Sequence, residues 1–160
     1  MRVILVAVFV AAIGGAGVLI GLASAGQYNA TSRGVLIEGY DPVAYIEQGY
    51  PRKGDPDYEV LHDGVTVFFA DEENMALFVD DPDRFMPAYG GFCSYGVRMG
   101  QKLDINPRAF TIKNGRLFLQ HDFGTQSVWR MDEAENIEIA DSVWPRIAEG
   151  PVDGKVIEVQ

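Results

Sequence analysis

The residues best able to do chemistry in this chain of 160 residues gather in one short stretch, Tyr89–Gly96. It contains Cys93, the only cysteine, between glycines and aromatic residues. Glycine lets backbone approach other groups closely, and aromatic side chains can wall a partly apolar pocket. A lone thiol in this setting is a candidate metal ligand or reactive group. The alternative is a buried cysteine that packs as a small hydrophobe.

The N-terminal segment predicts export. Residues 3–22 are apolar or glycine throughout, and Ala23-Ser24-Ala25 follows with the small-residue pattern of a cleavage site. Residues 1–25 are therefore predicted to be a signal peptide. An uncleaved membrane anchor is the alternative, because the apolar run approaches the roughly 20 residues that span a bilayer. The remainder is expected outside the cytoplasm, periplasmic or extracellular, where an unpaired thiol suggests a metal ligand, a reactive group or intermolecular pairing.

The charge of the chain narrows its partners. The chain has 13 Lys and Arg against 23 Asp and Glu, a net charge of −10. Removal of residues 1–25 would take away one of these cations, Arg2, and make the remainder more acidic. Such an acidic chain argues against nucleic-acid binding and against anionic lipid. The expected partners are a metal ion or small ligand and a periplasmic protein. Contact with the membrane is expected only through an uncleaved N-terminal segment.

Two β-hairpins are the clearest predicted elements. Asp63-Gly64 separates the β-rich runs 58–62 and 65–69, and Asn114-Gly115 separates the runs 109–113 and 116–120. Such pairs between two β-rich runs are typical of tight hairpin turns. A further short strand is expected at residues 35–37. No internal repeat is evident.

Helices are expected to flank the hairpins. Asp41 and Asp71 are predicted N-caps, Thr125 can cap a short helix, and Asp132 with Glu135 resembles a capping box. The last helix should kink or end at Pro145. We predict an α+β fold: a small antiparallel sheet built from two β-hairpins, with flanking short helices and a C-terminal helix. The predicted boundaries are a linker at residues 26–34, a domain at 35–148 and a C-terminal tail at 149–160.

Taken together, these pieces resemble the YHS domain family in its small exported form. The match rests on Gly39–Tyr45, on Phe69-Ala70 leading to Asn74 and Phe78, on Tyr89–Gly96, and on Leu117–Leu119 with Asn136-Ile137, Ala140-Asp141 and Trp144-Pro145. The resemblance implies a domain associated with metal binding, related to TRASH-type metallochaperone and metal-sensing modules. It implies no defined reaction, and a second cysteine for a thiolate pair is absent.

Within the matching segments, Cys93, Asp41 and the nearby His121 supply a thiolate, a carboxylate and an imidazole. These are reasonable ligands for copper or zinc, provided that Cys93 and His121 lie within a few ångströms. A pocket around them would be lined by the aromatic residues Tyr40, Tyr45, Tyr89, Phe92 and Tyr95. The resulting hypotheses are metal handling through a single cysteine, a non-metal ligand or protein interaction module with a structural cysteine, and a thiol redox protein or enzyme in which His121 is the base.

Overall fold

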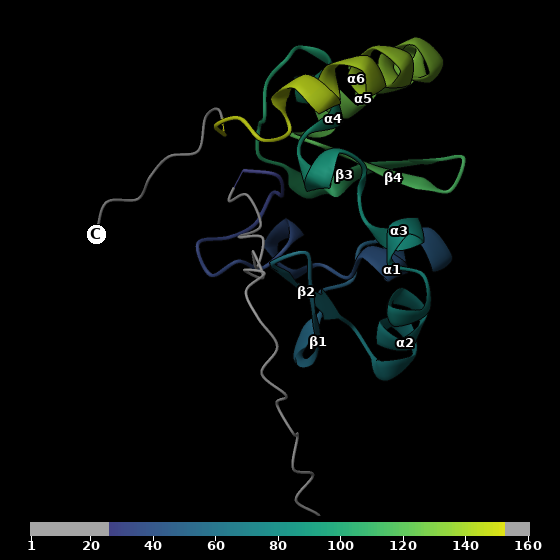
Figure 1. Cartoon of the computed structure of the whole chain (residues 1–160). Helices are drawn as coiled ribbons and strands as arrows, with labels where there is room; N and C mark the ends of the chain where they lie inside the picture. Colours follow the sequence, from purple (N-terminus) through teal and green to yellow (C-terminus); the bar gives the residue numbers. More distant parts are fainter. Residues whose placement is uncertain (1–25, 153–160) are drawn as a thin grey trace, which may run out of the picture.

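The computed structural model describes residues 26–152 (Figure 1). The predicted signal peptide or anchor and the last residues of the predicted tail lie outside this range. The α+β class is confirmed, with two antiparallel hairpins and six α-helices among the described residues, the last of which is the predicted C-terminal helix. The hairpins do not share one sheet, because each forms a separate two-stranded sheet. Across residues 26–152, no helix has the length and apolar character that crossing a membrane would require.

The first half of the domain occupies the lower part of Figure 1. A tight turn at Ile37–Gly39 leads into α1, and a hairpin and two further helices follow. Its elements are α1 (Pro42–Glu47), β1 (Asp55–His62), β2 (Val65–Phe69), α2 (Glu72–Asp80) and α3 (Pro82–Phe85).

The second half lies above it and has the same kinds of element in the same order (Figure 1). A turn at Ala88–Gly91 leads into a short helix, a hairpin and two helices. These are α4 (Ser94–Arg98), β3 (Asn106–Lys113), β4 (Arg116–Gln120), α5 (Phe123–Met131) and α6 (Glu133–Ile147). Pro145 lies inside α6, two residues before the helix ends.

The two halves form an internal structural repeat, although no repeat is evident in the sequence. β1 and β3 each have 8 residues, β2 and β4 each have 5, and α2 and α5 each have 9. Both hairpins turn through two residues with positive φ, and both have a register shift near the start of the first strand. The caps of the last helices, Asp81 and Asp132, have nearly the same backbone angles, φ −145° and ψ 78° against φ −149° and ψ 78°. They lie 51 positions apart, as do the caps Asp71 and Asp122.

Two apolar clusters hold the halves together internally and to each other. The first includes Tyr45, Phe69 and Cys93 and draws on both hairpins. The second, around Phe92 and Trp129, lies under α6. Burial of apolar side chains from both halves in the first cluster makes the two halves one folding unit.

Residues 26–34 are packed onto the domain and are not a free linker. Asn29 is only 5% exposed, and its side-chain amide donates to the Gly91 carbonyl (3.2 Å) and to Asp104 (3.1 Å). The predicted strand at 35–37 is reduced to isolated bridges, because the chain enters a left-handed turn at Ile37. The buried Lys102 ammonium donates to the carbonyls of residues 26, 148 and 150, which fastens both ends of the described chain.

Candidate functional site

Cys93 is the N-cap of α4 and is completely buried. Its sulfur accepts backbone N–H groups from Gly96 (3.4 Å) and from His121 (3.3 Å). The thiol lies 3.8 Å from the Gln120 side-chain oxygen, which can accept its proton. Burial raises the pKa of the Cys93 thiol, and the backbone N–H groups oppose that rise only in part. The neutral thiol is therefore the form at pH 7.

Asp41 holds the equivalent place in the first half. One carboxylate oxygen accepts the N–H groups of Val43 (2.8 Å) and Ala44 (3.2 Å) at the start of α1. The other accepts the N–H of Ala70 (2.9 Å) and the side-chain amide of Asn74 (2.6 Å). Asp41 is thus the predicted helix cap, and it also ties α1 to the segment that joins β2 to α2.

The hydrogen-bond donors to these two helix caps occupy equivalent positions in the two halves. Ala70 and His121 each follow the second strand of their hairpin, and each donates its backbone N–H to the cap of the short helix. Asp41 and Cys93 each also accept an N–H from the first turn of that helix. The thiol therefore stands where the first half has a carboxylate, and it performs the same structural task with a weaker acceptor.

Gln120 beside the thiol was not anticipated from the sequence. It is completely buried, and its side-chain nitrogen has no hydrogen-bond partner among the described residues. An unsatisfied buried donor costs about 1–3 kcal/mol. In the repeat, Gln120 takes the place of the apolar Phe69, since each ends its hairpin. Alignment of the Asp-Gly and Asn-Gly turns was the one sequence signal that could have shown this exchange.

The predicted ligand trio does not form a ligand set. The His121 ring is exposed, and its Nδ1 lies 3.0 Å from the carbonyl oxygen of Asp104. Only the backbone of His121 contacts Cys93. Both oxygens of Asp41 are already occupied by donors of the first half. Within residues 26–152, no group of three or more His, Cys, Asp or Glu side chains is arranged to hold a metal ion.

The predicted pocket-lining aromatics are distributed between the two clusters. Tyr45 is buried in the first cluster and donates its hydroxyl to the Pro107 carbonyl (2.7 Å), and the half-buried Tyr40 packs beside that cluster. Tyr89 and Phe92 belong to the second cluster, and Tyr95 contacts both. They form the core on either side of Cys93 and do not surround it with a common cavity.

Tyr89 also contributes its hydroxyl to a polar group with Asp141 and Arg116 at the edge of the second cluster. Its hydroxyl donates to Asp141 (2.9 Å), which also pairs with Arg116 through two hydrogen bonds. Burial raises the pKa of Tyr89, and the Arg116 hydrogen bonds lower the pKa of Asp141. This group links α6 to β4 and to the second turn, so its evident role is structural.

No family model, curated protein or solved structure matches this chain. The resemblance to YHS domains therefore stays a prediction, based on the motif residues alone.

Proposed function

We propose that this chain is an exported, YHS-like binding module without catalytic activity, in which Cys93 is a structural residue. The observation that supports this function is the position of the thiol. Its sulfur is fully buried, accepts two backbone N–H groups, and replaces the carboxylate that caps the equivalent helix. Each of these contacts uses the sulfur within the fold and leaves it without access to a substrate.

The same arrangement argues against the two other hypotheses. Copper or zinc would need Cys93, His121 and Asp41 around one point, and the described residues do not fit such a site. A nucleophilic cysteine would need a base within hydrogen-bond reach. The His121 ring is hydrogen-bonded to the Asp104 carbonyl and not to the Cys93 sulfur. Export is proposed from residues 1–25, whose apolar character and small-residue ending favour a cleaved signal.

Metal titration of the purified domain tests this function. We expect titrations of residues 26–160 with Zn²⁺ and with Cu⁺, measured by isothermal calorimetry, to show no stoichiometric binding. The control is Cys93→Ser, which should give the same trace as the natural chain. Stoichiometric binding that Cys93→Ser abolishes would contradict the proposal and restore metal handling. A thiol that reacts with iodoacetamide as fast as free cysteine would contradict it as well.

A further inference from the structure

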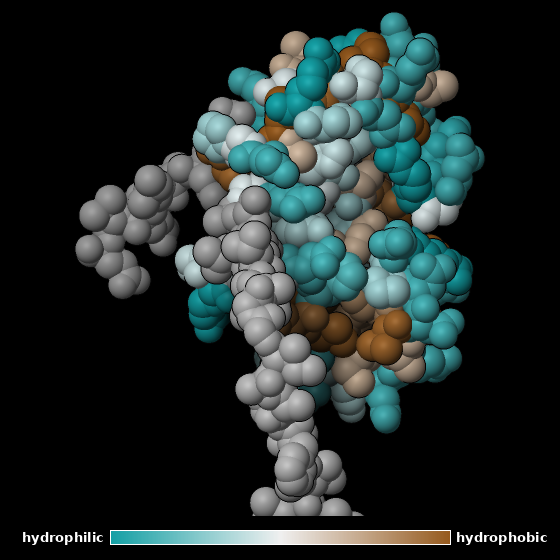
Figure 2. Space-filling view, viewed as in Figure 1, coloured by the Kyte–Doolittle hydropathy of each residue, from teal (hydrophilic) through white to brown (hydrophobic). Residues whose placement is uncertain are grey.

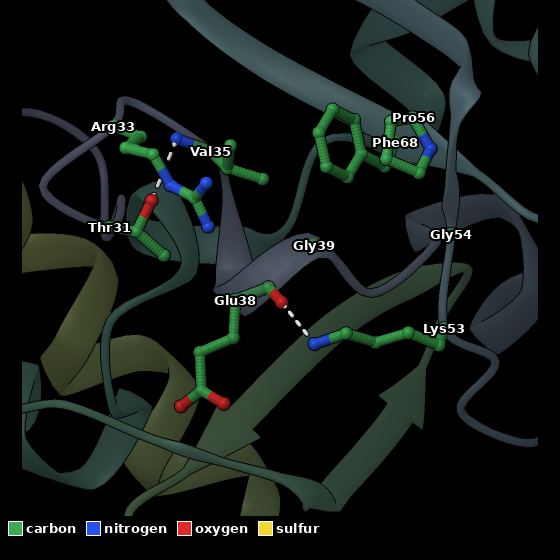
Figure 3. A pocket seen from close by; sticks show the side chains of 9 residues that line it. All are labelled: Thr31, Arg33, Val35, Glu38, Gly39, Lys53, Gly54, Pro56 and Phe68. Carbon is green, nitrogen blue, oxygen red and sulfur yellow. Dashed lines mark hydrogen bonds between the residues drawn. The ribbon is translucent and has the colours of Figure 1, made fainter.

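A surface pocket of about 260 Å³ lies beside the first turn, away from Cys93 (Figure 3). Its walls come from the segment after residue 30, the first turn, the segment before β1, the start of β1, and β2. Side chains of both charge types meet an apolar surface there. The lining residues that matter are Thr31, Arg33, Glu38, Lys53, Pro56 and Phe68.

Two glycines lie against Phe68, Gly54 at its Cβ and backbone and Gly39 at its ring. A Cβ atom at Gly54 would lie 2.5 Å from the Phe68 Cβ, and one at Gly39 would lie 3.1 Å from its ring. The Gly54 N–H donates to the Gly39 carbonyl (2.9 Å), which holds these two segments together. Pro56 stands next to the Phe68 ring (Figure 3). The pocket therefore offers a flat apolar surface that any larger residue at either glycine would disturb.

The polar side of the pocket carries one available cation. Arg33 is exposed, and its guanidinium forms no hydrogen bond or ion pair with any described residue. Lys53 already donates to the Glu38 carbonyl and lies over the Tyr40 ring at 4.5 Å. Figure 3 shows the Glu38 carboxylate directed away from Arg33 and Phe68. Two cations and one carboxylate leave the pocket with a single net positive charge in an acidic protein.

The turn under the pocket is conformationally strained. Ile37 and Glu38 have φ values of 41° and 58°, in the left-handed region that β-branched residues in particular avoid. Such residues cost on the order of 1–3 kcal/mol each and are concentrated at binding sites. The second turn has the same left-handed backbone at Tyr89 (φ 56°), so this conformation belongs to the repeat, and in the first half it presents Glu38 and Gly39 to the pocket.

The repeat provides an internal comparison for this turn. In the second half, residues 27–29 pack directly against the equivalent turn. The Asn29 N–H donates to the Gly90 carbonyl (2.8 Å), and a Cβ at Gly90 would lie 2.0 Å from the Gln27 carbonyl oxygen. In the first half, Glu38 and Lys53 take those places and the surface stays open. A second pocket of about 210 Å³ borders this second turn, but its lining includes Asp63 and Asp83 and, among the described residues, no arginine or lysine. The pairing of an exposed arginine with an apolar aromatic surface is therefore specific to the pocket of the first half.

From these observations we infer that the pocket binds a small organic monoanion, a carboxylate attached to a flat apolar body. Arg33 pairs with the carboxylate through its planar fork of donors. The Thr31 hydroxyl oxygen accepts the Val35 N–H (3.2 Å), so its proton is available to the same anion. The apolar body lies against Phe68 and Pro56. This inference deepens the proposed function and rests on it, since it names the ligand class of the binding module.

Benzoate is a suitable probe, with benzamide as its neutral isostere and phenyl phosphate as the dianion. We expect benzoate to shift the backbone amide signals of residues 31–39 and 53–55 in ¹⁵N-labelled protein. Arg33→Gln should weaken benzoate binding at least 10-fold, whereas Arg108→Gln, at another exposed arginine, should leave it unchanged. Benzamide should bind at least 10-fold more weakly than benzoate.

Four outcomes would overturn the inference: no benzoate binding, binding that Arg33→Gln leaves intact, equal binding of benzamide, or tighter binding of phenyl phosphate. These outcomes are distinguishable from failure of the proposed function. That failure appears as metal binding or thiol reactivity at Cys93, and neither readout involves Arg33. Gly54→Ala offers a second variant, which should reduce benzoate binding through the apolar surface while Arg33 is retained.

Discussion

Replacement of Cys93 by valine and by serine distinguishes a helix cap from a small hydrophobe. Valine has a similar volume but accepts no hydrogen bond, so the N–H groups of Gly96 and His121 lose their acceptor. An unsatisfied buried donor costs about 1–3 kcal/mol, and we expect Cys93→Val to lower the free energy of unfolding by about 2–4 kcal/mol. Serine keeps an acceptor at this position, and its hydroxyl can donate to Gln120. We expect Cys93→Ser to cost about 1 kcal/mol, for lost apolar contacts.

Urea unfolding followed by tryptophan fluorescence measures both variants. With m values of about 1–3 kcal/mol/M for a domain of this size, the midpoint for Cys93→Val should fall by roughly 1 M or more. The slope should stay the same, because the change affects the native state. If cysteine were here only for apolar packing, valine would be the better replacement. A valine variant as stable as the serine variant, or more stable, would refute the capping role.

Two further predictions concern the second half. Gly91→Ala should lower the free energy of unfolding by about 2–4 kcal/mol, because φ is 85° and the new Cβ would lie 2.6 Å from a side-chain carbon of the first turn. The control is Gly115→Ala, at φ 73° with open space around it, which should cost only about 1 kcal/mol. Equal losses in urea unfolding would contradict the close approach of the two turns. The hydrogen bonds from Arg116 lower the pKa of Asp141 in the folded state, so its contribution is present above the unfolded value of about 3.9 and is lost as the pH falls towards the folded value. Asp141→Asn should therefore flatten the pH dependence of the free energy of unfolding below about pH 4. The control is Asp57→Asn, at an exposed aspartate. A slope unchanged from that of the natural chain, or an equal flattening by Asp57→Asn, would argue against this role of Asp141.

The features that were predicted correctly depend on local chemistry. Asp63-Gly64 and Asn114-Gly115 set their turns because both positions need positive φ, which asparagine, aspartate and glycine tolerate. Asp71 and Asp132 cap their helices because their side chains reach an N–H three residues on. Thr125 was a wrong assignment for a related reason. The cap is Asp122, and Thr125 supplies the N–H that it accepts.

The features that were missed depend on distant parts of the chain. Ile37 favours a strand by its side chain, yet it lies in a left-handed turn that the buried surroundings hold in place. Spacing could not show that His121 turns its ring to Asp104 while its backbone contacts Cys93. The repeat escaped detection because the halves share turn and cap positions more than residue types. Aspartate corresponds to cysteine at one cap, and phenylalanine to glutamine at the end of the second strand.

The burial of Cys93 makes it a natural reporter of local opening. It is the only thiol in the chain, and no part of it is exposed in the folded state. An alkylating reagent reaches the sulfur only when the start of α4 separates from β4. The labelling rate in native conditions is then the intrinsic rate multiplied by the population of the open form, which gives the free energy of that opening directly. Comparison with the free energy of global unfolding would show whether the second half opens alone or only together with the first.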